Sequence, residues 1–411
     1  MTDFNKRLDQ YADLLVRVGI NLQPGQELII TSSIEHADLA RRVVAKAYDA
    51  GARRVSVDWS DPQTSRMTLA RADAEALGEY PAPLAKWREE HLEKGGAQLA
   101  IVGNDPKLMA GIDPQRISTL QQATARATQA IAGYTATMRR SWSIGAAAVQ
   151  GWADSAMAHL PAEERVPALW DAILKACRVY GDNDPVADWQ VHLARLAKWV
   201  TFLNEKKFAR LHYKGPGTDL VIDLPQNHVW ISAGNAANEK GVPFCPNMPT
   251  EEVFTAPARE GVNGVVRSTL PLNYGGTLIK ELSLRFEKGR VVAFSASEGQ
   301  EVLQGLFDTD EGARYLGEVA LVPIDSPINQ TGILFYNTLF DENASCHLAV
   351  GRAYPICVEG GGSMSSEQRL AAGLNQSVTH VDFMIGSPAL DIDGELPTGE
   401  LVPLFRKGMW V

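Results

Sequence analysis

The stretch ELIITSSIEHADLARRVVAKAYDAGARRVSVDWS, residues 27–60, decides the fold of the first half of this chain. ELIITSS (27–33) is a short apolar run typical of a strand. HADLARRVVAKAYDAGA then repeats apolar residues at helical spacing and ends close to a glycine. RRVSVDWS (53–60) alternates with period two, as a second strand does. A strand, a helix and a strand in this order favour a parallel sheet covered by helices.

The same pattern continues downstream. AQLAIVGN (97–104) is a further predicted strand, and RISTLQQATARATQAIAGY (116–134) is a predicted helix. Two more helices are predicted over 161–179 and 184–207, each opened by a proline or an acid. There is no GxxxxGK[ST] loop and no GxGxxG after a strand, so the sequence disfavours a nucleotide site.

After about residue 208 the pattern changes to short strands separated by glycine-bearing turns. ARLHYKGPGTDLVIDL (209–224) predicts a hairpin, and the segments 264–272, 276–297 and 315–323 are strand-like, while 298–307 and 366–374 are helical. The boundary falls near 185–208. We therefore predict an α/β N-terminal domain with a mainly parallel sheet (1–200), followed by a β-rich α+β catalytic domain (201–411).

Composition limits the partners and the compartment. With 39 basic and 49 acidic residues the formal net charge is −10, which argues against nucleic acid as the main partner. No window reaches about 18 uninterrupted apolar residues, so no membrane partner is expected. The N-terminus has no apolar signal core, and the four cysteines show no CxxC spacing, which suits a reducing cytoplasm.

The second half places acids inside apolar strands. Glu252 lies in PTEEVFTAP and Glu318 in YLGEVALVP. In THVDFMIG, His380 and Asp382 are two residues apart, so a strand turns both to one face. A buried carboxylate without a partner costs several kcal/mol, so such groups are usually neutralised, paired or bound to a cation.

DENASCHLAVGRAYP (341–355) adds two acids and an amide ahead of His347. Each of these features has a simpler interpretation: a salt-bridged glutamate, a hydrogen-bonded His-x-Asp pair, or an Asx-type turn in which Asp341 or Asn343 satisfies backbone groups. Their concentration in the last 160 or so residues favours a metal site. The candidates are carboxylates and imidazoles, which suit Zn, Co, Mn or Mg: Glu252, Glu318, Glu342, His347, His380 and Asp382.

Four segments carry a resemblance to a known family: NMPTEEVFTAP (247–257), GEVALVP (317–323), LFDENASCHLAVGRAYP (339–355) and HVDFMIGS (380–387). In this order they resemble the thermophilic-aminopeptidase family, typified by bacterial aminopeptidases T and S. The resemblance covers essentially the whole chain, through the closing GELVPLFRKGMW.

The resemblance implies a dinuclear metallo-aminopeptidase that acts on peptides with a free N-terminal amine. It implies two divalent ions per chain, a metal-bridged water as the nucleophile, and a homodimer with enclosed active sites. Glu318 is expected to bridge the ions, Glu342 to be a further ligand or a base, and Tyr354 to stabilise the oxyanion. The residues that match the family's metal ligands are Glu252, Glu318, His347, His380 and Asp382.

Three other functions remain open at this point. The first is a metal-dependent hydrolase of another amide or ester, and the second is a non-catalytic protein that binds metal or peptide. The third is a serine hydrolase built on Ser363, His380 and an aspartate such as Asp391, which the absence of a GxSxG elbow disfavours.

Overall fold

The computed structural model describes residues 2–411, and its internal contacts divide the chain into two compact units. The first unit runs as far as His192 and also contains Ala236–Pro249. The second unit consists of Leu193–Asn235 and Thr250–Val411. The chain crosses from one unit to the other inside helix α10 (Pro185–Lys206).

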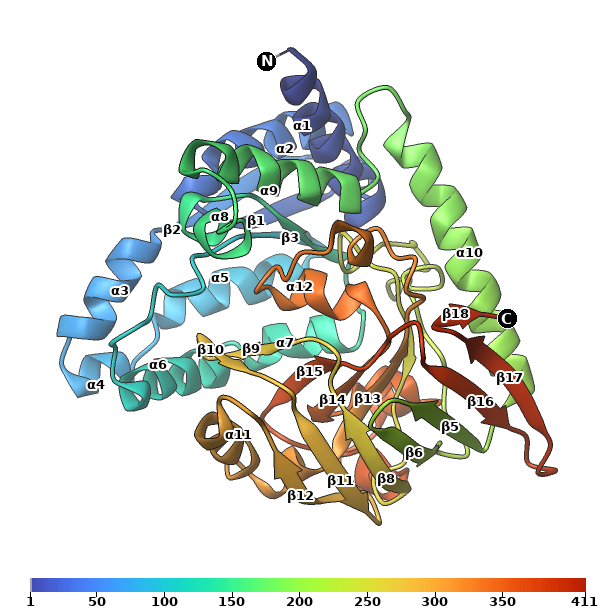
Figure 1. The fold of residues 1–411 in the computed structure, drawn as a ribbon. Coiled ribbons are helices and arrows are strands. Elements are labelled where there is room, and N and C mark those ends of the chain that lie inside the picture. Colours follow the sequence, from blue (N-terminus) through green and yellow to red (C-terminus); the bar gives the residue numbers. More distant parts are fainter. Residues whose placement is uncertain (1) are drawn as a thin grey trace. The chain divides into compact units, whose positions relative to one another are not determined.

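The first unit is built on a parallel four-stranded sheet of order β2-β1-β3-β4 (Figure 1). β1 is mostly buried because parallel strands are usually covered on both faces by helices. The strands are β1 (Glu27–Ser33), β2 (Arg54–Ser60), β3 (Ala97–Val102) and β4 (Trp142–Ala146). The helices are α1 (Thr2–Leu14), α2 (Ala37–Asp49), α3 (Pro62–Arg71), α4 (Ala74–Leu77), α5 (Ala82–Glu93), α6 (Pro114–Ala127), α7 (Gln129–Ala136), α8 (Gln150–Ala156) and α9 (Ala162–Ala176).

One predicted helix differs from the structure. The segment 116–134 is broken at Thr128, whose backbone leaves the helical region (φ −104°, ψ 14°) between α6 and α7. The Thr128 hydroxyl donates to the Thr124 carbonyl at 2.8 Å, a bond to the preceding turn that often accompanies a bend in a helix. The sequence analysis also missed β4, a five-residue strand in which serine and glycine weaken the apolar signal.

The second unit contains two larger antiparallel sheets and a small two-stranded one. The eight-stranded sheet has the order β12-β11-β8-β6-β5-β16-β17-β18, the four-stranded sheet has the order β15-β14-β13-β7, and β10 pairs with β9. The strands are β5 (Arg210–Gly215), β6 (Thr218–Asp223), β7 (Val253–Thr255), β8 (Val262–Arg267), β9 (Leu272–Tyr274), β10 (Thr277–Ile279), β11 (Ser283–Glu287), β12 (Arg290–Ser295), β13 (Leu316–Leu321), β14 (His347–Gly351), β15 (His380–Met384), β16 (Asp391–Glu395), β17 (Leu401–Arg406) and β18 (Met409–Trp410).

Short helices complete this unit, namely α11 (Gln300–Phe307), α12 (Thr338–Asp341) and α13 (Ser366–Ala371). The predicted hairpin is present, with β5 and β6 joined at Gly217, whose φ of +74° suits glycine. The predicted fold class, α/β with a parallel sheet and then a β-rich α+β part, is confirmed. Within residues 2–411, no helix combines the length and apolar character needed to cross a bilayer.

The four-stranded antiparallel sheet β15-β14-β13-β7 of the second unit has an apolar face and a polar face. Its larger apolar side chains enter the hydrophobic core of the second unit: Val253, Val319, Leu321, Leu348, Val350, Val381 and Phe383. Residues between these positions point to the opposite face, because successive side chains in a strand alternate. That opposite face carries the polar residues singled out in the sequence.

Candidate metal centre

Neighbouring strands bring the candidate residues together on the polar face of the sheet β15-β14-β13-β7. Ala349 in β14 lies opposite Asp382 in β15 and opposite Glu318 in β13, and residues directly opposite share a face. His347 is two residues before Ala349, and His380 is two before Asp382, so both histidines belong to the same face. Glu252 immediately precedes β7, the edge strand next to β13.

A bulge in β13 turns Glu318 to this face. Leu316 pairs with Val350, whereas Glu318 pairs with Ala349, so Gly317 is an extra residue in the ladder. In a regular strand, residues 316 and 318 would share a face; here Leu316 enters the core and Glu318 does not. A Cβ on Gly317 would lie 2.4 Å from the carbonyl oxygen of Arg352, so no other residue fits without a shift.

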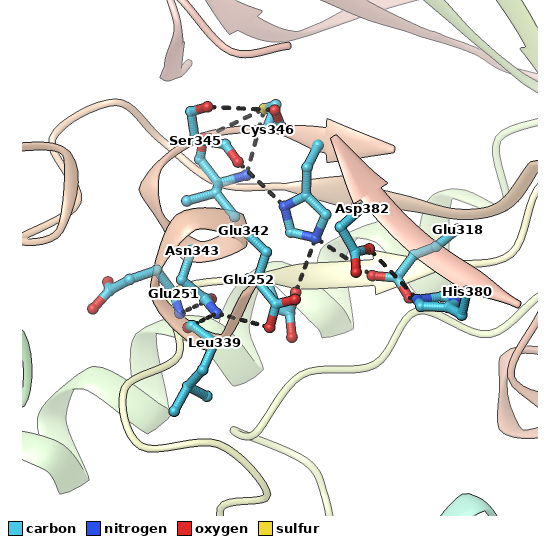
Figure 2. A network of polar contacts seen from close by, with 12 residues as sticks. Glu251, Glu252, Glu318, Leu339, Glu342, Asn343, Ser345, Cys346, His380 and Asp382 are labelled. Atoms are coloured by element: carbon cyan, nitrogen blue, oxygen red, sulfur yellow. Dashed lines mark hydrogen bonds and ion pairs between the residues drawn. The ribbon is translucent and has the colours of Figure 1, made fainter. Parts of the chain in front are cut away.

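The side chains form two groups that share one glutamate. Nε2 of His347 lies 3.3 Å from Glu252 Oε2 and 3.5 Å from Glu318 Oε1. Nε2 of His380 lies 3.5 Å from Glu318 Oε2 and 3.5 Å from Asp382 Oδ1. Within each group the donor atoms lie within 4.8 Å of one another, and Figure 2 shows Glu318 between His380 and the other ligand group. Each oxygen of Glu318 therefore faces a different histidine.

Both imidazoles are oriented by backbone carbonyls. Nδ1 of His347 lies 3.2 Å from the Ser345 oxygen, and Nδ1 of His380 lies 2.7 Å from the Arg352 oxygen. Because a carbonyl oxygen can only accept, each Nδ1 carries the proton and donates it. Nε2 is then the nitrogen whose lone pair can face a cation, as in most protein metal sites.

The buried nitrogen of His347 offers a direct test of whether a metal fits. His347 is completely buried, and its Nε2 makes no hydrogen bond of normal geometry within residues 2–411. Buried polar atoms are nearly always satisfied, so an orphaned imidazole nitrogen facing two carboxylates is an unusual feature. A divalent cation would satisfy it, and the donor set of carboxylates and imidazoles is one that such cations accept.

Burial and neighbouring charges shift the pKa values of the groups in this cluster. Burial raises the pKa of Glu318 and of Glu342, in the second case well above the usual range. Burial opposes the charged form of His347, but Glu252 and Glu318 outweigh it and raise the pKa of His347 well above its usual value. For His380 the opposing effects of burial and Asp382 leave the pKa at about 9. Burial therefore disfavours the charged form of each of these groups, and the opposite charges nearby act against that effect.

Glu342 and Tyr354 lie beside the two groups. Glu342 begins the 3-10 turn η5 (Glu342–Ala344) after α12, and its pKa responds to the charges of Asp382 and Glu252. Tyr354 stands just before the turn η6 (Pro355–Cys357), with its ring 5.0 Å from the His380 ring between centroids. Burial and then the charges of Glu318 and Asp382 raise the pKa of Tyr354. No hydrogen bond joins its hydroxyl to another residue within residues 2–411.

The simpler interpretation of the DENA segment holds for Asp341. Its carboxylate accepts the backbone N–H groups of Phe335 at 2.8 Å and Asn337 at 3.0 Å, which makes it a turn-stabilising residue. The serine-hydrolase arrangement is not formed. Ser363 donates to the Gly360 carbonyl, and Asp391 accepts the backbone N–H of Lys407.

Several residues that shape this centre were not predicted from the sequence. Ala349 and Gly317 were missed because small residues in an apolar strand carry no polar signal, and the carbonyls of Ser345 and Arg352 are invisible to side-chain reasoning. Asn343 was considered only as a turn residue. In the structure it is fully buried and contacts Glu342.

A buried sheet face with two histidines and convergent carboxylates fits the class of metal-dependent enzymes that use divalent ions. Comparison with known proteins agrees with that class. The model of the thermophilic metalloprotease (M29) family matches residues 4–410. This chain belongs to that family, and the predicted resemblance and the prediction of a hydrolase are confirmed.

The similar proteins cover the chain from end to end. Aminopeptidase AmpS of Bacillus subtilis is 48% identical over 410 residues, and aminopeptidase T of Thermus thermophilus is 45% identical over 412 residues, each covering 100% of both chains. The solved structure of wild-type AmpT from Thermus thermophilus has a TM-score of 0.93 at 45% identity, covering 99% of this chain and 100% of that one.

Proposed function

We propose that this protein is an aminopeptidase that removes N-terminal residues from peptides with a free α-amine, using two divalent ions. The observation that carries this proposal is the shared glutamate: Oε1 of Glu318 faces His347 and Oε2 faces His380. A carboxylate with one oxygen towards each of two ligand groups suits a bridge between two ions. The names of the relatives, which are aminopeptidases, support the choice of reaction.

The ligands divide between two sites. Glu252 and His347 would hold one ion, His380 and Asp382 the other, and Glu318 both. Together with Glu342, this centre contains four carboxylates and two imidazoles, and two divalent cations would balance the four negative charges. Zn, Co, Mn and Mg all accept such ligands, so the metal that is bound in the cell depends on supply as well as on affinity.

When bound, such ions lower the pKa of a shared water and polarise the scissile carbonyl. Glu342 lies next to the cluster and outside both ligand groups, so it is suited to accept a proton and deliver it to the leaving amine. The raised pKa of Tyr354 keeps its phenol protonated at neutral pH, and its unpaired hydroxyl can donate to the oxyanion. The acid-rich face supplies negative charge for the substrate's α-ammonium group.

We also propose the arrangement around this centre that the sequence suggests. The catalytic domain would comprise residues 201–411 and the N-terminal domain residues 1–200. The protein would act as a homodimer in the cytoplasm, as the family resemblance and the cysteine content lead us to expect.

The decisive experiment compares blocked and unblocked substrates. Protein stripped with a chelator should be inactive, and cobalt should restore cleavage of a leucyl amide. The same amide carrying an N-acetyl group should not be cleaved, because the α-amine is required. Equal cleavage of both would indicate a hydrolase of another amide or ester, and metal binding without any turnover would indicate a non-catalytic protein.

A further inference from the structure

Asn343 uses its whole side-chain amide in hydrogen bonds at the edge of the metal centre (Figure 2). Oδ1 accepts the backbone N–H of Glu251 at 2.8 Å. Nδ2 donates to the Leu339 carbonyl at 3.1 Å and to Glu342 Oε1 at 3.3 Å. The backbone carbonyl of Asn343 accepts the Ser326 hydroxyl at 2.6 Å. A side chain that is fully buried and fully bonded is fixed in one orientation.

These bonds join two segments that are distant in the sequence. Glu251 is followed directly by the predicted ligand Glu252, and Leu339 belongs to the helix that leads to Glu342. Glu251 and Asn343 are 92 residues apart along the chain. The Asn343 amide therefore connects the main chain next to Glu252 to the side chain of Glu342.

We propose that Asn343 is a positioning residue that fixes Glu342 relative to Glu252. This role deepens the proposed function and rests on it. The amide donates to one oxygen of Glu342, which holds the carboxylate in one rotamer and leaves the other oxygen for proton transfer or for an ion. The same amide fixes the backbone at Glu251 and thereby the point from which the Glu252 side chain projects.

The chemistry of the position explains why an amide is needed. Aspartate would keep an acceptor for the Glu251 N–H but would place a second carboxylate against Glu342. Leucine has a similar volume, yet it would leave the Glu251 N–H unsatisfied in a buried place, which is costly. Only an amide offers an acceptor and two donors at this length.

The test uses Asn343→Asp with Asn204→Asp as the matched control. Asn204 also accepts a backbone N–H and donates to a backbone carbonyl, both of Trp230, at 2.8 and 3.0 Å. Among the described residues it makes no hydrogen bond to a carboxylate. Three quantities are measured on full-length protein: cobalt affinity, the visible spectrum of the cobalt form, and kcat and KM for a leucyl amide.

Asn343→Asp should weaken cobalt binding or lower kcat by about 10- to 100-fold and alter the cobalt spectrum, as expected for a residue that orients metal ligands. KM should change much less than kcat. Asn204→Asp should leave the spectrum and kcat as in the wild type. An Asn343→Asp protein with wild-type affinity, spectrum and kcat would overturn the positioning role.

A double variant covers the case in which Asn343→Asp does not fold. In Glu342→Gln/Asn343→Asp, the new amide at 342 can donate to the new carboxylate at 343, so the contact is restored with reversed polarity. Its metal-free Tm should lie above that of Asn343→Asp but below that of Glu342→Gln, because the Leu339 carbonyl loses its donor in both variants that carry Asn343→Asp. A double variant as unstable as Asn343→Asp would show that this contact does not matter, and the inference would fail.

The two proposals fail differently. If the wild-type protein binds cobalt but never cleaves a leucyl amide, the aminopeptidase function is wrong. The cobalt spectrum and the double-variant Tm still report whether Asn343 positions Glu342.

Discussion

Replacing Glu318 with glutamine tests the shared-ligand geometry most directly. Glu318 is the one side chain with an oxygen 3.5 Å from each of the two histidines in the described cluster. Glutamine keeps the size and one oxygen but removes the charge, so it should weaken both ion sites together. Of the two histidines in the described cluster, Glu252 faces His347, at 3.3 Å, so Glu252→Gln should weaken one site and serves as the control.

The size of the effect follows from linkage. Free metal at 100 times its Kd stabilises a protein by about 2.7 kcal/mol per site, so two independent sites contribute about 5 kcal/mol. For a folding unit of 150–250 residues, 1 kcal/mol shifts Tm by about 2–4 °C, which gives about 10–20 °C for the wild type. Glu252→Gln should keep roughly half of that shift, and Glu318→Gln should keep little of it.

The assay is calorimetry with and without cobalt, together with metal analysis of dialysed protein. The wild type should hold two ions per chain. Metal-free Glu318→Gln should be at least as stable as the metal-free wild type, because burial raises the pKa of Glu318 and its charge is therefore unfavourable in the fold. This separates ligand loss from misfolding. A Glu318→Gln protein that holds one ion and keeps half of the Tm shift would refute the bridge.

Three further predictions follow from the same geometry. Metal-free protein should lose stability as pH rises from 6.5 towards 9, because the pKa of His380 is about 9 in the folded protein and 6.5 when the imidazole is unperturbed. The contribution of His380 is on the order of 3 kcal/mol, is fully present below pH 6.5, and its loss should appear as a falling Tm that cobalt suppresses. Tyr354→Phe should lower kcat by about 10²–10³ without changing metal content, and normal turnover would make Tyr354 only a packing residue. Gly317→Ala should weaken cobalt binding at unchanged kcat per bound ion, because the added Cβ meets the Arg352 carbonyl that orients His380. Unchanged cobalt binding would mean that the bulge does not determine the geometry of the ligands.

Much of the fold could be predicted because it follows from sequence patterns within short segments of the chain. The alternation in 27–60 is produced by residues that pack within one strand–helix–strand unit, and the structure has β1, α2 and β2 there. The break at Thr128 could not be predicted in the same way. A threonine inside an apolar period resembles any other helical residue, and Thr119 and Thr201 make the same hydroxyl bond to the preceding turn inside unbroken helices.

The candidate centre was predictable where ionisable residues occur inside segments that are otherwise apolar. An acid inside YLGEVALVP, or a histidine and an aspartate two apart in THVDFMIG, conflicts with burial unless something compensates for the charge. The same reasoning could not find Asn343 or the carbonyls of Ser345 and Arg352. Their roles depend on which distant segment lies opposite, and that is known only from the fold.

One signal in β14 was nevertheless present in the sequence. HLAVG alternates between His347, Ala349 and Gly351 on one face and Leu348 and Val350 on the other. The large apolar residues enter the core, whereas the positions facing the candidate ligands are small, and Ala349 lies directly between Glu318 and Asp382. Ala349 places only a methyl group between the two carboxylates, and at Gly351 a Cβ would lie 2.3 Å from the Thr379 carbonyl oxygen, so no larger side chain fits there without a shift. The alternation in HLAVG therefore distinguishes the face of β14 that packs in the core from the face that lies beside the candidate ligands.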